Sequence, residues 1–115
     1  MDAGDVVVLP FPYSNLASRK LRPALVLSPA WYHAKRDDAL LAFITSVRQD
    51  DPFAVALTQQ QLADGSLARP SWIRTDKLFT LDQALVRKTV ARLAPDALEQ
   101  VRDTVCAFVR GDNVA

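Results

Sequence analysis

The chain has 115 residues, a length that suits one domain over residues 1–115. Half of the residues are hydrophobic, and this composition is too apolar for a disordered chain. Its formal net charge of +1 does not by itself indicate a nucleic-acid-binding protein. No apolar run approaches the roughly 20 residues of a membrane span, and the single cysteine, Cys106, cannot form an internal disulfide. We therefore expect a cytoplasmic protein that does not contact a membrane.

Residues 6–9, a β-branched run after Gly-Asp, predict a first strand that is buried on both faces. Pro10 and Pro12 should end its hydrogen-bonded ladder, because proline has no N–H donor. A polar loop follows over residues 13–21. Further strands are predicted over residues 23–27 and 40–45, separated by a loop or helical turn over residues 28–38.

The second half of the chain continues with short elements. The patterns predict a strand over residues 53–57, a helical turn over 59–62, a turn at 64–65 and a strand over 71–77. Residues 85–93 fit a strand or a helix, and the strand propensity of their valines and threonine favours a strand. The acidic pairs at 37–38 and 50–51 are expected to lie in solvated turns.

The last element is predicted to be a helix that begins at Pro95 and ends before Gly111. Apolar residues recur every three or four positions along one stripe: Leu98, Val101, Val105, Phe108 and Val109. Cys106 borders this stripe, so we expect it to be a small core residue. Five or six short strands with one or two short helices predict a mainly β protein, a small, partly open β-barrel with a C-terminal α-helix packed on it.

Several kinds of catalytic site are poorly supported. With one histidine and one cysteine, the chain has no metal-ligand spacing, and its three glycines provide no phosphate-binding loop, so we expect no metal and no cofactor. A serine–histidine–aspartate triad would have to use His33, and a lone histidine in a loop is more often structural.

The remaining candidates for a functional site are polar residues at the ends of strands, namely arginine, threonine, serine and aspartate. Arg22 precedes a proline and so has an extended backbone, Thr45 and Ser46 end the third strand, and Arg74 and Asp76 are two apart on one strand face. Such a set could bind a phosphodiester and stabilise charge developing on it. RNA would supply its own nucleophile, the 2′-hydroxyl. The same pattern also fits a structural ion pair between Arg74 and Asp76 with Thr45 as a strand-end residue.

Four segments, "GDVVVLPFPYSNL", "KLRPALVLS", "AFITS" and "PSWIRTDKLFTL", resemble in order and spacing the motifs of the MazF/PemK (Kid-like) toxins of type II toxin–antitoxin modules. The resemblance covers nearly the whole chain. It implies an SH3-like barrel that forms a homodimer and a metal-independent endoribonuclease that cuts single-stranded RNA at short sequences. The 2′-hydroxyl would attack the adjacent phosphate, leaving 2′,3′-cyclic phosphate and 5′-hydroxyl ends. A cognate antitoxin protein would cover the RNA groove with a disordered segment.

The resemblance also implies a role for each candidate residue. Arg22 would contact the scissile phosphate, Thr45 would hydrogen-bond it, and Arg74 and Asp76 would act as acid and base. Many members carry a histidine just before the arginine; Leu21 stands there in this chain, so Asp76 takes the role of general base. The expected RNA-binding residues are Phe11, Tyr13, Ser18, Arg19, Lys20, Ser46 and Lys77.

Two alternatives come from other functional classes. CcdB-like toxins resemble this fold but poison DNA gyrase by binding, which requires exposed apolar and aromatic residues at the chain end; this chain ends in "RGDNVA". A barrel that only binds a protein partner, or binds RNA without cutting it efficiently, would show no RNA cleavage.

Overall fold

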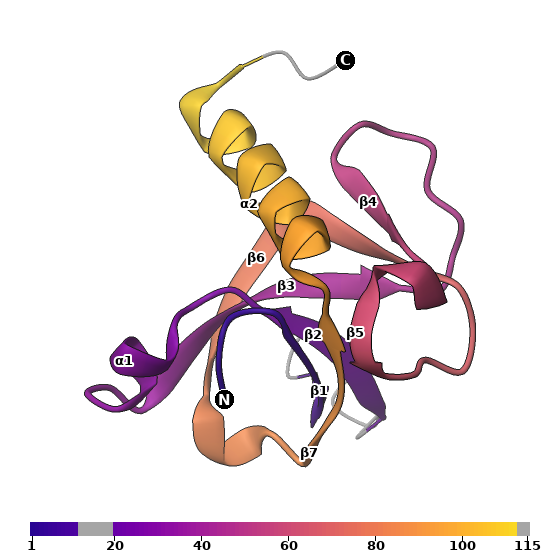
Figure 1. The fold of residues 1–115 in the computed structure, drawn as a ribbon. Coiled ribbons are helices and arrows are strands. Elements are labelled where there is room, and N and C mark those ends of the chain that lie inside the picture. The colour runs from indigo at the N-terminus through magenta and orange to yellow at the C-terminus, as the bar shows by residue number, and fades with distance from the viewer. Residues whose placement is uncertain (12–19, 113–115) are drawn as a thin grey trace.

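The fold is a curled antiparallel sheet with one long helix, seen in a computed structural model that describes residues 1–11 and 20–112 (Figure 1). The sheet has seven strands in the order β4-β6-β3-β2-β1-β7-β5. The strands are β1 (Asp5–Pro10), β2 (Leu21–Val26), β3 (Asp38–Thr45), β4 (Ala54–Leu57), β5 (Leu62–Gly65), β6 (Ser71–Asp82) and β7 (Lys88–Leu93). The helices are α1 (Ala30–His33) and α2 (Pro95–Arg110), with single 3₁₀ turns at Gln59–Gln61 and Gln83–Leu85.

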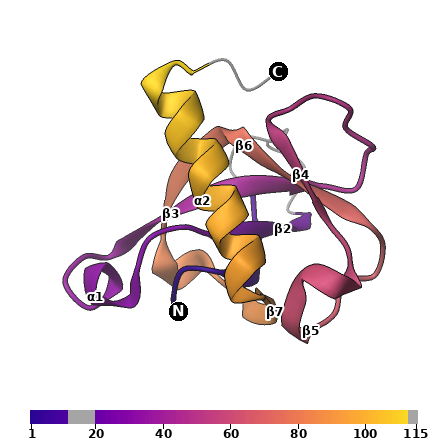
Figure 2. The same cartoon turned by 45° about the horizontal axis from the view of Figure 1, so that its top comes forward.

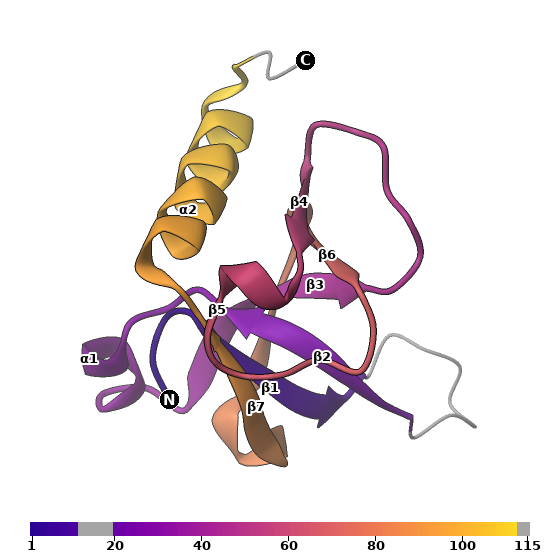
Figure 3. The same cartoon turned by 45° about the vertical axis from the view of Figure 1, so that its right-hand side comes forward.

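The two edge strands of the sheet are consecutive in the chain. β4 and β5 stand at opposite ends of the strand order, yet only Thr58 and the turn Gln59–Gln61 separate them. The sheet must therefore curl until its edges approach each other, as Figure 3 shows. This confirms the predicted small, partly open β-barrel with a C-terminal helix.

Each face of the curled sheet carries its own core. On one face, Val6, Leu25, Ile73 and neighbouring apolar residues pack beneath α2. On the other face, Val7, Leu9, Phe11 and Phe79 form a second cluster. Val6, Val7 and Leu9 have no exposed surface, so the prediction that β1 is buried on both faces is confirmed.

Helix α2 crosses the sheet diagonally (Figure 2), and its fully buried residues lie in its first half. Pro95 opens the helix and Gly111 ends it with a left-handed backbone (φ 83°), as predicted. Ala97 and Val101 are buried, whereas Phe108 and Val109 in the last turn are exposed. Cys106 is exposed as well, so the expectation of a core cysteine is wrong: its neighbour Val105 packs against the core, and Cys106 is left on the solvent side of the helix.

The predicted bounds of strands and turns are wrong mainly where pairing with a neighbouring strand sets the extent of a strand. Residues 64–65 belong to β5, because Asp64 and Gly65 pair with Arg92 and Ala91 of β7. The sheet has seven strands rather than five or six, and β6 continues to Asp82 because it pairs with the whole of β3. The first strand ends at Pro10, as predicted, although Pro10 itself is still part of it.

His33 has a structural role. Its Nδ1 lies 3.0 Å from the Met1 carbonyl oxygen, and its Nε2 lies 2.7 Å from the Ser28 hydroxyl. These contacts tie α1 to the chain start, on the side of the molecule where Figure 1 shows the N-terminus. Within residues 1–11 and 20–112, no helix is long and apolar enough to cross a membrane.

Candidate active site

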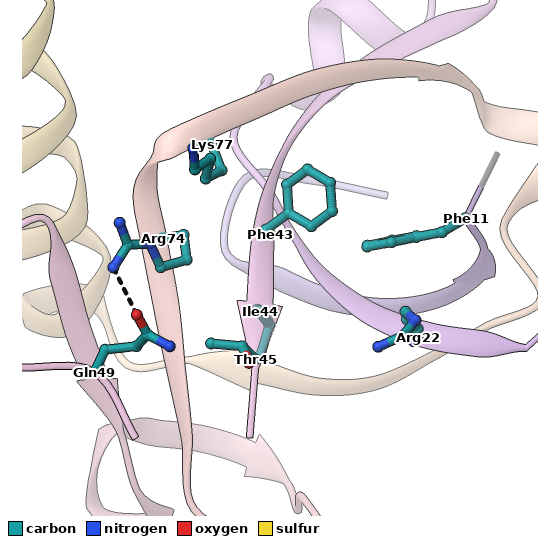
Figure 4. Close-up of a pocket in the computed structure, with 8 residues that line it drawn as sticks. All are labelled: Phe11, Arg22, Phe43, Ile44, Thr45, Gln49, Arg74 and Lys77. Carbon is teal, nitrogen blue, oxygen red and sulfur yellow. Dashed lines mark hydrogen bonds between the residues drawn. The ribbon is translucent and has the colours of Figure 1, made fainter. Parts of the chain in front are cut away.

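A cavity of about 580 Å³ opens beside the start of β2, the end of β3 and the first half of β6 (Figure 4). Three of the residues in its wall, Arg22, Thr45 and Arg74, were predicted from the sequence as catalytic, and two more, Phe11 and Lys77, were predicted to bind RNA. The full lining is Phe11, Arg22, Phe43, Ile44, Thr45, Gln49, Arg74 and Lys77. The cavity is therefore the place where the tertiary structure brings the predicted residues together.

Sheet register explains how Arg22 and Thr45 meet. Ala24 of β2 pairs with Phe43 of β3, and extending that register by two residues places Arg22 level with Thr45 on the same face. Phe43 in turn pairs with Arg74 of β6 on its other side. The side chains of three adjacent strands thus point into one cavity, and Figure 4 shows Thr45 between Arg22 and Arg74.

Arg22 and Thr45 both have donors available for an anion. Arg22 is exposed, and no ion-pair or hydrogen-bond partner is present for its side chain in the described part of the chain. The Thr45 hydroxyl oxygen accepts a hydrogen bond from the Val47 backbone N–H at 3.1 Å. Its hydroxyl hydrogen is left to donate to a ligand.

Arg74, by contrast, is held by three neighbours. Its Nη1 donates to the Gln49 side-chain oxygen at 2.8 Å and to the Asp51 carboxylate, and its Nη2 donates to Asp76 Oδ2 at 2.8 Å. Its side chain is only 14% exposed. Two carboxylates around one guanidinium leave this cluster with a net charge of −1, so it is poorly suited to bind a phosphate by itself.

The hydrogen bond between Arg74 and Asp51 shifts the pKa values of both groups in the directions expected for an ion pair. The Arg74 side chain, as hydrogen-bond donor, lowers the pKa of Asp51 below its ordinary value of 3.8. The hydrogen bond to Asp51 raises the pKa of the Arg74 guanidinium, and burial opposes that shift. Both groups are therefore charged at neutral pH. The sequence predicted a freely solvated turn for Asp51, and for this residue the prediction is wrong: Asp51 is half-buried and bound to Arg74.

Asp76 differs from Asp51 in one respect that matters for chemistry. Both oxygens of Asp51 are engaged, since Oδ1 accepts the Phe53 backbone N–H at 2.9 Å and Oδ2 binds Arg74. Asp76 binds Arg74 with Oδ2 alone, and its buried Oδ1 has no hydrogen-bond partner within the described ranges. An unpartnered buried oxygen is unusual and leaves Asp76 with a lone pair that could take a proton. Asp76 itself does not line the cavity.

A bulge in β6 places Lys77 in the same wall as Arg74. Phe43 pairs with Arg74, but the next residue back, Ala42, pairs with Leu78, so residues 75–77 bulge out of the ladder. Strict alternation would have put Arg74 and Lys77 on opposite faces. The bulge cancels that alternation, and both side chains line the cavity.

Aromatic side chains form one side of the cavity. Phe11 is 7% exposed and packs edge-to-face against Phe43, with ring centroids 4.7 Å apart. Phe79 lies behind them, 5.3 Å from Phe11 and 4.7 Å from Phe43 between centroids. Phe11 contributes to the wall from within this cluster, while the half-buried Phe43 is the more accessible ring.

The remaining predicted residues divide into two groups. Tyr13, Ser18 and Arg19 lie outside the described residues. Lys20 and Ser46 line a neighbouring groove that shares Arg22 and Thr45 with the cavity.

Three residues of the site were not predicted from the sequence: Phe43, Gln49 and Asp51. Phe43 lay inside an apolar run, and the other two lay in a polar loop with no periodic signal. In residues 1–11 and 20–112, no three histidine, cysteine, aspartate or glutamate side chains are grouped as metal ligands would be.

Residues 2–109 match the family model described as "PemK-like, MazF-like toxin of type II toxin-antitoxin system". The fold is similar to that of a MazE–MazF complex from Deinococcus radiodurans, with 28% identity, 98% of this chain and 97% of that chain covered, and a TM-score of 0.74. It is also similar to an endoribonuclease from a mycobacterial species in complex with its cognate antitoxin (17% identity, 96% and 95% covered, TM-score 0.75). The Mycobacterium tuberculosis toxin MazF-mt6 shows the same fold at 14% identity, with 95% and 98% covered and a TM-score of 0.75. No curated protein sequence matches the chain.

Proposed function

The chain belongs to the PemK-like, MazF-like toxin family of type II toxin–antitoxin systems, and from this premise we propose that it is a metal-independent endoribonuclease acting on single-stranded messenger RNA. The observation that carries the proposal is that Arg22 and Thr45, two available donors, line one cavity together with Arg74, whose guanidinium binds Asp76. The mycobacterial structural relative is an endoribonuclease, which agrees with this proposal.

The proposed reaction needs no group beyond the chain and its substrate. The scissile phosphate lies against Arg22 and the Thr45 hydroxyl, which orient it and stabilise the charge that develops on its oxygens. The 2′-hydroxyl of the preceding nucleotide attacks phosphorus, the bond from phosphorus to the 5′ oxygen breaks, and the products are a 2′,3′-cyclic phosphate and a 5′-hydroxyl.

Asp76 is the proton acceptor in this proposal, and Arg74 is the residue that holds it in place. The 2′-hydroxyl proton goes to Asp76 Oδ1, the oxygen that has no hydrogen-bond partner among the described residues. The same carboxyl then returns a proton to the leaving 5′ oxygen, because a guanidinium is too basic to donate one readily. Since Oδ1 is buried, RNA binding must open the wall between Arg74 and Lys77 for this transfer to occur.

Incubation of the purified protein with single-stranded RNA in excess chelator tests the proposal. We expect cleavage that leaves 2′,3′-cyclic phosphate and 5′-hydroxyl ends. Arg22→Ala should lower kcat/KM by about 100-fold or more, since removal of one charge-stabilising donor has effects of that order. Arg110→Ala is the matched control, because Arg110 is exposed at the end of α2 and lines no part of the cavity.

Three results would contradict the proposal. Full activity of Arg22→Ala would place the site elsewhere, 5′-phosphate ends would exclude attack by the 2′-hydroxyl, and a lack of cleavage without added metal would exclude metal independence. The CcdB-like alternative predicts growth arrest with intact RNA and poisoned DNA gyrase. Phe108 and Val109, exposed on the last turn of α2, are the residues that such binding would use.

We further propose that the chain is a homodimer and that a cognate antitoxin neutralises it. The Deinococcus radiodurans relative was crystallised as a MazE–MazF complex. Light scattering of the purified chain measures the oligomeric state directly. Co-expression with the product of the neighbouring reading frame tests the antitoxin: it should restore growth and co-purify with the toxin.

A further inference from the structure

A second groove, of about 570 Å³, lies on the other side of Arg22 and Thr45 from the cavity. It runs between the end of β3, the start of β2, the first residues of β7 and the connection from β5 to β6, which passes β2 in the view of Figure 3. Arg22, Ile44 and Thr45 line both spaces. The proposed cleavage point is therefore a boundary between two adjoining hollows.

The groove carries positive charge and no described acidic residue lines it. Its four cations are Lys20, Arg22, Arg69 and Lys88. All four are exposed, and none has an ion-pair partner in the part of the chain that the structure describes. On a chain with a net charge of only +1, this concentration of unpaired positive charge favours binding of a polyanion.

Hydroxyl groups accompany the cations, and aromatic rings do not. Ser46, Ser66 and Ser71 line the groove, whereas its described lining includes no phenylalanine, tyrosine or tryptophan. The first cavity has the opposite character, with Phe11 and Phe43 in its wall. Bases stack on aromatic side chains, while lysine, arginine and serine bind phosphates without regard to sequence.

We infer that this groove binds the sugar–phosphate backbone of the RNA segment on one side of the cleaved bond, with Arg69 and Lys88 as phosphate contacts. The inference rests on the proposed function, because it takes Arg22 and Thr45 as the position of the scissile phosphate. An RNA chain lying across Arg22 enters the aromatic cavity on one side and the basic groove on the other. The groove raises the affinity for longer RNA substrates, and it does not contribute to the recognition of the RNA sequence that is cleaved.

Arg69→Ala with Lys88→Ala is the test variant, since it removes two cations and leaves every residue of the cavity wall unchanged. Three oligoribonucleotides carry the same cleavage sequence: a short one, one extended on the 5′ side, and one extended on the 3′ side. Binding and cleavage of each are measured over a range of salt concentrations. Lys35→Ala with Arg110→Ala is the control, because both residues are exposed and line neither space.

We expect the wild type to bind one of the extended oligonucleotides more tightly than the short one, and the test variant to lose that advantage. The slope of log affinity against log salt should fall by about 1.4, since each neutralised phosphate of a single strand contributes roughly 0.7. The affinity of the test variant for the short oligonucleotide should equal that of the wild type. Its kcat and the sequence at which it cleaves should also be unchanged. The control variant should behave like the wild type.

The outcomes separate this inference from the proposed function. If the wild type cuts RNA but neither extension improves binding, or if the test variant keeps the advantage, the groove does not bind RNA. If the test variant binds RNA normally and instead loses dimerisation or antitoxin binding, the groove is a protein interface and the inference is wrong. If the wild type binds RNA without cutting it, the proposed function fails while the groove is still tested by affinity. If it neither binds nor cuts, both fail.

Discussion

Thr75 donates two hydrogen bonds to one acceptor, the carbonyl oxygen of Phe53: its backbone N–H at 2.9 Å and its hydroxyl at 2.6 Å. Thr75 is fully buried at the start of the β6 bulge, and Phe53 follows the loop that carries Gln49 and Asp51. The two bonds join the bulge to that loop. They hold Arg74 and its partners in one arrangement.

Thr75→Val should therefore weaken both the fold and the reaction. Valine has nearly the same shape but lacks the hydroxyl, and the backbone N–H still satisfies the Phe53 carbonyl, so we expect a loss of about 1 kcal/mol in the free energy of unfolding. The rate should fall as well, because the loop and Arg74 become less fixed. Denaturant unfolding and kcat measure the two effects. Thr80→Val, an exposed change on the same strand, should alter neither.

Asp76→Asn tests the proton acceptor. The amide keeps the size of the carboxylate but cannot take a proton at neutral pH, so kcat should fall by about 100- to 10,000-fold with little change in KM. Asp50→Asn, in an exposed loop position with a side chain 82% exposed, is the control. If Asp76→Asn keeps its kcat, Asp76 only holds Arg74, and the interpretation of Arg74 and Asp76 as a structural ion pair is sufficient.

Asp51→Asn should have a different effect from Asp76→Asn. It removes one of the two negative charges beside Arg74, and the net charge near the cavity becomes more positive by one. We expect KM for RNA to fall by roughly two- to five-fold, a modest change because Asp51 is partly solvated. Steady-state kinetics at constant salt measure it. A loss of kcat as large as that of Asp76→Asn would instead identify Asp51 as the proton acceptor.

The Asp51–Arg74 interaction also predicts a pH dependence of stability. Its hydrogen bond with Arg74 lowers the pKa of Asp51 from its ordinary value of 3.8, so the unfolded chain binds this proton more readily than the folded one. The contribution is complete above the ordinary value and is lost as pH falls through the lower folded value. The stability difference between the wild type and Asp51→Asn, measured by denaturant unfolding, should be constant from about pH 7 to pH 5 and vanish in stronger acid. A difference that disappears near neutral pH would contradict the assignment.

Two glycines with similar backbones should differ in how they tolerate alanine. Gly111 (φ 83°) has no atom within 4 Å of an added Cβ, so Gly111→Ala should cost about 1 kcal/mol of backbone strain. Gly65 (φ 77°) would place that Cβ 2.2 Å from the Val90 carbonyl oxygen. Gly65→Ala should therefore cost clearly more and loosen the pairing of β5 with β7. Thermal unfolding of the two variants compares them, and equal midpoints would contradict this expectation.

Elements with local signals can be predicted from the amino-acid sequence. The β-branched run 6–9 and the capped apolar stripe of α2 carry their own periodicity, and the proline after Arg22 correctly predicts that the backbone of Arg22 is extended. The pairing of Arg74 with Asp76 follows from the two-residue repeat of a strand and was predicted correctly. For these residues, short-range geometry alone sets the outcome.

The surroundings of those residues depend on how distant segments pack together. Cys106 borders the apolar stripe of α2 and is exposed, whereas Val105 beside it packs against the core. Asp51 reaches Arg74 from 23 residues away, and Lys77 enters the cavity because a bulge against β3 reverses the strand's alternation. Each of these depends on register between distant segments, and register is set by how the whole sheet buries its two faces rather than by neighbouring residues in the chain.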